Sequence, residues 1–545
     1  MEQKAQEKPK MVNLTINGKA ISVPAGTSVF QAAADAGIFI PHYCYHPDLS
    51  IAGVCRMCMC DVEKNPKLQI SCNTMATEGM VVRTDTDKVK ETVKGVLELH
   101  LINHPLDCPI CDKAGECKLQ DFYVDYGLYQ SRMEYDKKVH KPKVVDIGTI
   151  VLDSERCILC SRCVRFTAEV TKTNELGIFN RGDRSELRTY DDGPLRNDYT
   201  GNLADICPVG ALTAKDFRFQ CRVWFLEKTN SVCTMCARGC NTTVSVNPNT
   251  RTLYRVEPRR NPEVNKSWIC DTGRWDFHYV SDQKRIKVPR KQVDGRWVEQ
   301  SWHIAFQDLH EAIVAKPESI LVGLGTSLTN EELADLVLTL KSKGVKHFAW
   351  IVDETVVSER TPFDGILKHR DLTANALGFE TVMKALGVPW LRLKEASELL
   401  KQGTIKRVLA LGLEGEVMPG LDKFLAAIPK AVPVAVQATS DSPLLETVEY
   451  VLPNVSCFEK NGTVISAVGR LQKVNAALPW QGTARDGHAL AFGLERGNDR
   501  DIPTPGRAQK YFENTVVEKI LMSSNQKWRS FNPFGIAMME NTVHG

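Results

Sequence analysis

The chain has 545 residues and a net charge of +3, with charged and hydrophobic fractions of 25% and 43%. These values are typical of an ordinary soluble protein with about three or four domains. So small a net charge gives no global electrostatic argument for nucleic-acid binding. No apolar run reaches the roughly 18–20 residues that span a bilayer, and the charged N-terminus lacks the apolar core of a secretion signal. We therefore expect neither a signal peptide nor a transmembrane segment.

Cysteine usage narrows the class of protein. Of the 18 cysteines, all but Cys270 and Cys457 lie between Cys44 and Cys240. In a secreted chain this density would indicate disulfides. In a chain without a secretion signal it indicates metal binding.

The first elements predict a small α+β domain. Residues 12–23 alternate in polarity around an Asn-Gly turn, which is typical of a β-hairpin. Thr27 or Ser28 can cap a short helix over 29–36. A hairpin followed by a crossing helix is typical of plant-type ferredoxins.

Four cysteines after this helix are candidate ligands of a [2Fe–2S] cluster: Cys44, Cys55, Cys58 and Cys72. The Cys55-x2-Cys58 pair is the one that ferredoxins use. Ten residues separate it from the preceding cysteine, however, where plant-type ferredoxins have four. Cys60 falls in the same loop, and we interpret it as a buried small side chain rather than a ligand.

Residues 85–103 carry valine and leucine at helical spacing and predict a helix. It leads into a histidine and three cysteines, which form a second candidate set: His104, Cys108, Cys111 and Cys117. Structural zinc accepts three thiolates and an imidazole, so it competes here with a [4Fe–4S] cluster. The iron–sulfur motifs on either side favour the cluster. A neutral imidazole in place of a thiolate should raise the potential of such a cluster.

The third set has three cysteines at two-residue gaps, closed much later by a cysteine before proline: Cys157, Cys160, Cys163 and Cys207. Three thiolates on one tight loop suit three corners of a [4Fe–4S] cluster. Zinc also binds four thiolates, but its sites usually join two Cys-x2-Cys pairs. The polar stretch 181–193 between the two halves of the motif predicts a surface loop, and Cys221 is interpreted as structural.

A fourth set again offers four thiolates and predicts another [4Fe–4S] cluster: Cys233, Cys236, Cys240 and Cys270. Residues 243–246 and 252–256, which lie between its members, alternate like a β-hairpin. No acid–base pair or nucleophile stands out in the chain, so no catalytic residue is predicted.

Beyond the fourth set, two βαβ units predict a parallel sheet. In the first, a helix begins at the capping box Thr329-x-x-Glu332, between strands at 319–324 and 347–352. The second unit covers 407–436.

Two further features of this part bear on ligand binding. The glycines after its first strand do not complete a dinucleotide fingerprint, because position 328 is leucine. We therefore expect no nicotinamide cofactor on this chain. The basic run 284–291 lacks interleaved aromatic residues and predicts a solvated or subunit-facing surface rather than a nucleic-acid contact.

In this order, the four sets resemble the large multi-iron–sulfur subunits of bacterial NADH:quinone oxidoreductase, respiratory complex I. The likeness is close over about residues 12–275, and the remainder is similar to a shortened molybdopterin oxidoreductase. It implies an α+β multidomain fold with five parts: a β-grasp [2Fe–2S] ferredoxin-like domain at 11–83, a helical His/Cys-ligated [4Fe–4S] domain at 84–145, a [4Fe–4S] ferredoxin-like domain at 146–225, a fourth [4Fe–4S] domain of molybdopterin-oxidoreductase type at 226–275, and a truncated molybdopterin-oxidoreductase-like α/β domain with a parallel sheet at 276–545.

The resemblance also implies a function: an electron-transfer subunit with one [2Fe–2S] and three [4Fe–4S] clusters, without flavin or NAD of its own. Each of the four sets takes the name of its first residue. Electrons from NADH and flavin on a neighbouring subunit would enter at the Cys44 set, pass through the Cys157 set, and leave from the His104 set toward quinone. The Cys233 set would lie off this line.

Partners and location follow from the same resemblance. The implied partners are the flavin/NADH-binding subunit, the small [2Fe–2S] subunit of the peripheral arm, a ferredoxin-like subunit with two [4Fe–4S] clusters, and the quinone-site subunits. Such a complex would hold the chain on the cytoplasmic side of the inner (plasma) membrane and couple the reaction to proton translocation.

Three alternatives remain from the sequence. A catalytic molybdenum or tungsten formate dehydrogenase would need a metal ligand, yet no cysteine occurs between 271 and 456, and Thr272 stands where that family tends to have lysine. We therefore expect no molybdopterin. An NAD-linked hydrogenase subunit shares the first three sets, but the long pterin-like tail disfavours it. A zinc-stapled interaction scaffold is the non-redox alternative.

Overall fold

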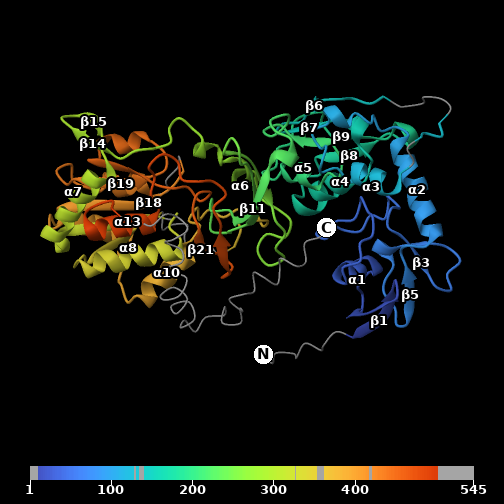
Figure 1. Ribbon diagram of the computed structural model, residues 1–545, viewed down its shortest axis with the longest axis horizontal. Coiled ribbons are helices and arrows are strands. Elements are labelled where there is room, and N and C mark those ends of the chain that lie inside the picture. The colour runs from blue at the N-terminus through green and yellow to red at the C-terminus, as the bar shows by residue number, and fades with distance from the viewer. Residues whose placement is uncertain are drawn as a thin grey trace. The chain divides into compact units, whose positions relative to one another are not determined.

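The computed structural model describes residues 10–127, 130–133, 140–325, 327–352, 361–415, 420–500 and 502 (Figure 1). The chain divides into two compact units, with the division in sequence between Phe225 and Leu226. Unit 1 precedes this point and unit 2 follows it. The last part of the predicted 276–545 domain, residues 503–545, lies outside the described residues.

Unit 1 begins with a five-stranded mixed sheet in the order β2-β1-β5-β3-β4. The predicted hairpin is confirmed as β1 and β2, which pair antiparallel, while β1 also pairs parallel with β5. Asn17 and Gly18 join the hairpin with φ of 49° and 81°, the left-handed geometry of the turns that match strand twist. The strands are β1 (Met11–Ile16), β2 (Lys19–Pro24), β3 (Met59–Val62), β4 (Gln69–Ile70) and β5 (Met80–Arg83).

Helix α1 (Val29–Asp35) covers one face of this sheet. The Ser28 hydroxyl accepts a hydrogen bond from the Gln31 amide and so caps the helix start, as predicted. Val29 and Phe30 pack with Leu14 and other buried strand residues in one hydrophobic core.

The rest of unit 1 combines short helices with two small sheets. Helix α2 packs against β3 and α3, and it confirms the helix expected over 85–103. β10, β7 and β6 form one sheet, and β8 and β9 form a hairpin. The elements are α2 (Asp87–Leu101), α3 (Lys118–Tyr126), β6 (Val145–Asp146), β7 (Ile150–Leu152), α4 (Arg162–Arg165), β8 (Leu176–Phe179), β9 (Glu186–Thr189), α5 (Asn202–Ile206) and β10 (Leu212–Ala214).

One prediction for unit 1 was wrong. Strand β9 lies within the stretch 181–193, which had been interpreted as a surface loop. Its Leu187 and Thr189 are buried, so alternate side chains face inward although the surrounding stretch is polar.

Unit 2 opens with the three-stranded sheet β11-β12-β13. The predicted hairpin at 243–256 is confirmed by the antiparallel pairing of β12 and β13, with a bulge between Ser245 and Val246. The elements are β11 (Glu227–Val232), β12 (Asn241–Asn247), β13 (Thr252–Pro258) and the short helix α6 (Asp271–Trp275).

A seven-stranded sheet forms the centre of unit 2, in the order β15-β14-β20-β19-β18-β16-β17. The five strands from β20 to β17 are parallel, as both βαβ units predicted, whereas β14 and β15 add an antiparallel edge. The strands are β14 (Arg290–Val293), β15 (Arg296–Glu299), β16 (Ile320–Leu324), β17 (His347–Trp350), β18 (Arg407–Leu413), β19 (Val434–Ala438) and β20 (Tyr450–Pro453).

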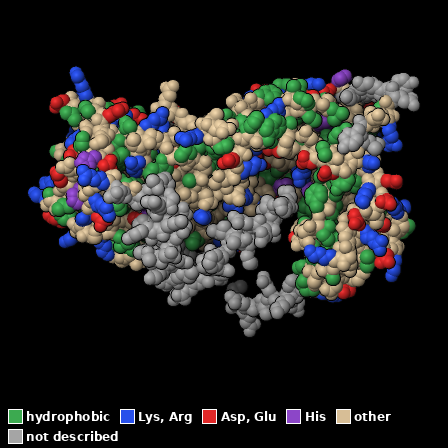
Figure 2. Space-filling view, viewed as in Figure 1, with side chains coloured by type: hydrophobic (Ala, Val, Ile, Leu, Met, Phe, Trp, Pro, Cys, Tyr) green, Lys and Arg blue, Asp and Glu red, His purple; other side chains and the backbone are tan. Residues whose placement is uncertain are grey.

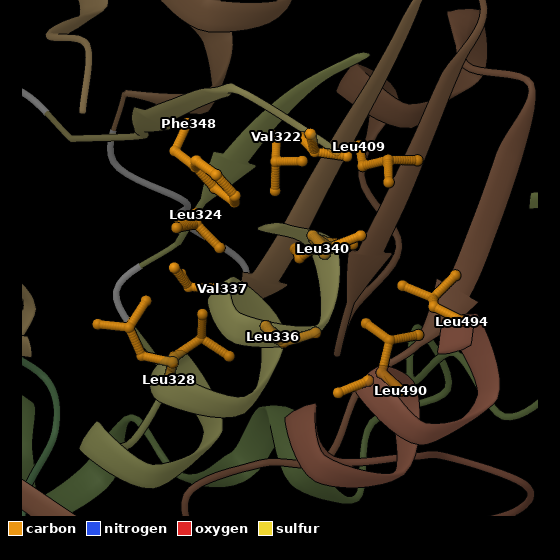
Figure 3. Close-up of a cluster of buried hydrophobic side chains, with 14 of the residues drawn as sticks. Val322, Leu324, Leu328, Leu336, Val337, Leu340, Phe348, Leu409, Leu490 and Leu494 are labelled. Carbon is orange, nitrogen blue, oxygen red and sulfur yellow. The ribbon is translucent and has the colours of Figure 1, made fainter. Parts of the chain in front are cut away.

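Helices cover both faces of this sheet, and β16 contributes to both cores. Val322 and Leu324 pack with one set of helices, whereas Leu321 packs with the other, because successive residues of a strand point to opposite faces. Figure 3 shows the first core, in which Leu340 of α8 and Leu490 of α13 gather with strand residues. Its helices are α7 (Trp302–Ala315), α8 (Asn330–Ser342), α10 (Ala376–Ala385) and α13 (Gly487–Arg496); those of the second core are α11 (Leu393–Lys401) and α12 (Leu421–Ala426).

The capping box predicted at the start of α8 is confirmed. The Thr329 hydroxyl accepts from the Glu332 amide at 3.2 Å, and the Glu332 carboxylate accepts from the Thr329 amide at 2.8 Å. This reciprocal pair satisfies amide groups that the first turn of a helix leaves without partners.

Two features of the described residues concern their helices and their surface charge. None of their helices is long and apolar enough to cross a bilayer. On the face seen in Figure 2, Lys and Arg side chains are intermixed with Asp and Glu, in line with the small net charge.

Candidate metal centres

The structure brings the four cysteines of the Cys44 set together. Three of them lie in the long loop between α1 and β3, and Cys72 lies in the 3-10 turn Ser71–Asn73. The Cys44 amide donates to the Cys55 Sγ at 3.4 Å. The thiols hydrogen-bond in two pairs, Cys44 with Cys55 and Cys58 with Cys72.

Within each pair, the hydrogen bond lowers the pKa of the accepting thiol and raises the pKa of the donating one. The hydrogen bond from Cys55 lowers the pKa of Cys44 to about 5, and the hydrogen bond from Cys72 lowers the pKa of Cys58 to about 7. The donating thiols have pKa values raised by the same bonds and by burial. Thiolates are the form that binds metal, and these hydrogen bonds favour the thiolate form of Cys44 and Cys58.

Cys60 is the fifth cysteine of this region and is not among the predicted ligands. It is fully buried on β3 within the hydrophobic core, and burial raises its pKa to about 12. This agrees with its interpretation as a small apolar side chain.

Three cysteines of the His104 set are placed by the chain between α2 and α3. Cys108 opens the 3-10 turn Cys108–Ile110, and the amide of Cys111 donates to the Cys108 carbonyl at 3.2 Å. Cys117 directly precedes α3, and burial raises its pKa to about 11. His104 is buried just beyond the end of α2 and within electrostatic reach of Asp107. Its role as the fourth ligand stays a prediction.

The Cys157 set lines a cavity. Its four cysteines border a space of roughly 380 Å³, open mouth included, that protein atoms leave unfilled. Leu159 and Ser161 adopt positive φ of 54° and 61° between the cysteines, which coils the loop tightly, and the Leu159 amide donates to the Cys157 Sγ at 3.4 Å. Left-handed residues that alternate in this way turn backbone amides toward an anion.

Burial dominates the acidity of three cysteines of the Cys157 set. It raises the pKa of Cys157 to about 12 and that of Cys160 to about 11, and it also raises the pKa of Cys163. Buried thiols of this kind lose their protons only when a positive charge compensates the thiolate. A cluster of ferric and ferrous ions supplies that charge.

The Cys233 set lies in unit 2, where secondary structure holds it from both sides. The Cys233 amide, just after β11, donates to the Cys240 carbonyl at 2.8 Å just before β12. Cys270 precedes α6, and its Sγ accepts from the Gly273 amide at 3.4 Å. Burial raises the pKa values of all four thiols, and repulsion from other cysteines of the set adds to the effect at Cys233, Cys240 and Cys270.

The C-terminal strands tie this fourth set into unit 2. Strands β21 (Gly462–Ile465) and β22 (Leu471–Val474) form a short antiparallel hairpin. The Gln472 side chain on β22 donates to the Gly239 carbonyl at 2.7 Å. The Ala237 amide donates to the Asp371 carbonyl at 2.9 Å. Residues far along the chain therefore fix the loop that carries three of the four cysteines.

Within unit 1, the Cys157 set borders the His104 set. Gly210, three residues after Cys207, faces the Cys111 Sγ so closely that a Cβ on Gly210 would overlap it. The Lys118 amide, next to Cys117, donates to the Pro208 carbonyl at 3.0 Å. Arg156 binds the Asp107 carboxylate with two nitrogens, at 2.6 and 3.2 Å.

The Cys44 set borders the other two sets as well. The Tyr43 ring is fully buried and packs on Phe122 of α3, with the ring centroids 5.2 Å apart. Arg165 donates to the Cys44 carbonyl at 2.5 Å. The three sets of unit 1 are thus joined through residues that flank their cysteines.

The donor chemistry fits iron–sulfur clusters. Sulfur is the ligand that such clusters take, and a cluster distributes its cysteines over several irons. Among the described residues, no group of three or more His, Cys, Asp or Glu side chains is disposed to hold one metal ion.

The prediction of a solvated surface for the basic run 284–291 was wrong in part, because Lys284 and Lys287 are exposed whereas other cations of the run pair within the chain. Arg285 is buried and forms an ion pair with the buried Glu459 at 2.5 Å, and Lys291 pairs with Asp308 at 2.7 Å. Acidic partners from distant parts of the chain draw these cations inward, and local sequence patterns could not anticipate that.

Sequence reasoning also missed the arginines that hold the cluster loops. Arg156 and Arg162 are both buried next to predicted ligands. The only available signal was their position, because Arg162 stands inside the Cys157–Cys163 motif itself.

Comparison with known proteins assigns the class. Family models match four segments: a 2Fe-2S iron-sulfur cluster binding domain at 9–87, the NADH-ubiquinone oxidoreductase-G iron-sulfur binding region at 94–132, the ferredoxin-like domain of NADH-quinone oxidoreductase subunit 3 at 148–213, and an NDSU1/NuoG-like 4Fe-4S domain at 226–278. The chain is therefore an iron–sulfur protein with 2Fe–2S and 4Fe–4S binding domains.

Its relatives narrow this class further. The G subunit of NADH-quinone oxidoreductase from Rickettsia felis is 38% identical over 62% of this chain and 50% of its own length. The protein of the same name from Streptomyces coelicolor is 40% identical over 59% of this chain and 38% of its own length. The chain is thus similar to the G subunits of NADH-quinone oxidoreductase over about three-fifths of its residues, and it spans about half the length of the curated relatives it matches.

Among solved structures, the chain is similar to the NAD+-reducing [NiFe]-hydrogenase in the H2-reduced state, with 30% identity and a TM-score of 0.35. The match covers 39% of this chain and 91% of that chain.

Proposed function

We propose that this chain is an electron-transfer subunit of NADH:quinone oxidoreductase, respiratory complex I, coupled in the whole complex to proton translocation. It would receive electrons from the NADH- and flavin-binding subunit and pass them toward quinone. The clusters would carry the electrons, and the polypeptide would fix their spacing, burial and hydrogen bonding. No substrate chemistry takes place on the chain itself.

One observation carries this proposal: the loops of three ligand sets are packed against one another within unit 1. Gly210 reaches the Cys111 thiol from the Cys157 set, and Arg165 reaches the Cys44 carbonyl from the same set. A continuous series of buried redox centres is what a chain of electron transfers requires, and a zinc-stapled scaffold has no need of it.

The proposed ligands are the four sets as predicted: Cys44, Cys55, Cys58 and Cys72 for one [2Fe–2S] cluster, and for three [4Fe–4S] clusters His104, Cys108, Cys111 and Cys117; Cys157, Cys160, Cys163 and Cys207; Cys233, Cys236, Cys240 and Cys270. Electrons would run from the Cys44 set through the Cys157 set to the His104 set, with the Cys233 set off the line. The mixed sheet of β1 to β5 supports a β-grasp domain around the first cluster.

The C-terminal part is proposed to be a molybdopterin-oxidoreductase-like domain without the pterin. At the start of α8, the Lys460 ammonium donates to the Ser327 carbonyl at 3.0 Å and forms an ion pair with Glu332 at 3.5 Å. Both of these partners belong to the chain itself. In doubly wound sheets, a helix start of this kind is where ligand phosphates bind. Here the protein's own Glu332 carboxylate caps it.

The proposed partners are the flavin/NADH-binding subunit, the small [2Fe–2S] subunit, a ferredoxin-like subunit with two [4Fe–4S] clusters, and the quinone-site subunits. The chain would lie in the peripheral arm, on the cytoplasmic side of the inner (plasma) membrane, and reach the membrane only through the complex.

The test is chemical analysis of the purified chain together with EPR of its reduced form. One binuclear and three cubane sites correspond to about 14 irons per chain with matching acid-labile sulfide, and the EPR spectrum should contain both cluster types. A pale, zinc-rich and iron-poor protein would overturn the proposal. So would bound molybdenum or tungsten with turnover of a substrate such as formate.

A further inference from the structure

Two arginines of α4 connect the loop of the Cys44 set to that of the Cys157 set. Arg162 donates through one nitrogen to the Ile206 carbonyl at 3.1 Å and through another to the Tyr45 carbonyl. Arg165 donates to the Cys44 carbonyl at 2.5 Å and to the Cys160 carbonyl at 3.5 Å.

The accepting carbonyls share one property. Each belongs to a predicted cluster ligand or to the residue beside one, because Tyr45 follows Cys44 and Ile206 precedes Cys207. The two guanidinium groups therefore hold the backbone of both ligand loops at once, across more than a hundred residues of sequence in the case of Cys44.

A π-helical turn adds a further link next to the arginines. The turn Phe166–Val170 follows α4 directly and presents Glu169, whose carboxylate accepts from the Ser50 amide at 2.9 Å. Arg165 also donates to the Ser50 carbonyl. Insertions of this π type re-aim side chains and occur frequently at functional sites.

Within the part of the chain that the structure describes, the charge of Arg162 has no acidic partner. The residue is 6% exposed, and among the described residues neither Arg162 nor Arg165 forms an ion pair with a carboxylate. The groups that face Arg162 electrostatically include the thiols of Cys160, Cys207 and Cys44, and also the basic side chains of Arg165, Lys118 and His42. A buried cation needs a compensating anion, and here the available anions come from both ligand sets.

We propose that Arg162 and Arg165 are positioning residues for electron transfer between the Cys44 set and the Cys157 set, and that their charges favour the reduced state of both clusters. This inference rests on the proposed function. One electron leaves the donor cluster, which is oxidised, and enters the acceptor cluster, which is reduced, without bond or proton transfer. The transferred electron faces the same two guanidinium groups while it is on the donor cluster and after it has reached the acceptor cluster.

Geometry and charge can be separated by substitution. Lysine keeps the positive charge but lacks the planar fork that lets Arg162 bind two carbonyls in different directions. Glutamine removes the charge and retains a short donor. Loss of a cation near a cluster destabilises the more negative, reduced form, so a glutamine variant should lower both reduction potentials.

The experiment is an EPR-monitored redox titration of the full-length protein with its clusters, with iron per chain measured on the same samples. Arg162→Gln is expected to shift the reduction equilibria of both the binuclear and the Cys157-set cubane signals about tenfold toward the oxidised form, ~59 mV for a one-electron couple. Arg162→Lys should stay near the wild-type potentials. Arg196→Gln is the matched control, since Arg196 is 75% exposed in the same unit, and it should change neither potential.

If Arg162→Gln loses iron, Arg165→Gln decides, with the same downward shift expected at the binuclear cluster. Glutamine variants with full iron content and unmoved potentials would overturn the inference while leaving the proposed function standing. A lysine variant that shifts as far as the glutamine variant would overturn the role of charge. Absence of both cluster signals from the wild-type protein would instead overturn the proposed function.

Discussion

Gly210 lies against the Cys111 thiol, with no room between them for even a methyl group. The contact joins the end of the Cys157 set to the middle of the His104 set. The backbone of Gly210 does not lie in the left-handed region, so alanine would be tolerated there conformationally. The effect of alanine at this position is therefore purely steric.

We expect Gly210→Ala to displace the Cys111 Sγ and weaken the cluster of the His104 set, at an overpacking cost of about 1–3 kcal/mol. The measurement is iron content combined with the EPR signals of the reduced protein. One cubane signal should broaden or disappear while the binuclear signal persists.

Gly95 is the control for this substitution. It lies in α2, and apart from its chain neighbours and the backbone of its own helix no atom lies within 4 Å of the place that a methyl group on Gly95 would take. Gly95→Ala should therefore stabilise the helix by about 0.5–1 kcal/mol. Equal loss of cluster signal in both variants would contradict the steric explanation for Gly210.

His104 gives a prediction about redox potential. His104→Cys should keep a cluster but lower its potential, because a thiolate adds a negative charge where the imidazole is neutral. His104→Ala should lose or weaken the same cluster. Redox-poised EPR is the measurement, and an unchanged set of signals in His104→Ala would exclude ligation by this residue.

The buried pair of Arg285 and Glu459 gives a prediction about stability. Their side chains are 1% and 0% exposed, so Arg285→Ala leaves an uncompensated carboxylate and should cost about 3–5 kcal/mol. The neighbouring Lys287 is exposed, and Lys287→Ala should stay within about 0.5 kcal/mol of wild type. Urea unfolding followed by tryptophan fluorescence measures both. Similar losses in the two variants would indicate that the whole segment, rather than the ion pair, is sensitive.

The pH dependence of unit 2 should report on His488. Burial disfavours its charged form, but the hydrogen bond with Asp335 and the charges of Asp335, Asp486 and Glu332 outweigh burial and raise its pKa to about 9. A raised pKa stabilises the fold fully below the ordinary value near 6.5, and this contribution is lost as pH rises through 9.

The free energy of unfolding should therefore fall between about pH 7 and pH 10, by an amount on the order of 3 kcal/mol. In His488→Gln this part of the slope should be absent. An identical pH profile in the variant would show that another group titrates there.

Local signals predicted the local structure well. The Asn17-Gly18 turn and the Thr329–Glu332 capping box depend on neighbouring residues only, and both formed as expected. The cysteine motifs predicted which segments gather thiols, because ligand spacing within a loop is a local property. The structure brings the four cysteines of the Cys44 set together, and their role as ligands stays a prediction.

Contacts between distant segments were beyond sequence reasoning. Glu459 lies 174 residues from Arg285, and nothing in the basic run indicates that a carboxylate will neutralise it internally. The order in which the cluster loops touch depends on residues such as Gly210 and Arg165, whose roles exist only after folding. Strand β9 was missed because its inward-facing Leu187 is surrounded by charged residues in sequence.

The alternation along β16 sets a rule for how this part of the molecule can change over evolutionary time. Its side chains alternate between two separate interiors, so exchanging one aliphatic residue for another perturbs a single interior at a single point. Deleting or inserting one residue would instead send every later side chain of the strand to the opposite side. Sequence drift is tolerable there, whereas a change in length is not.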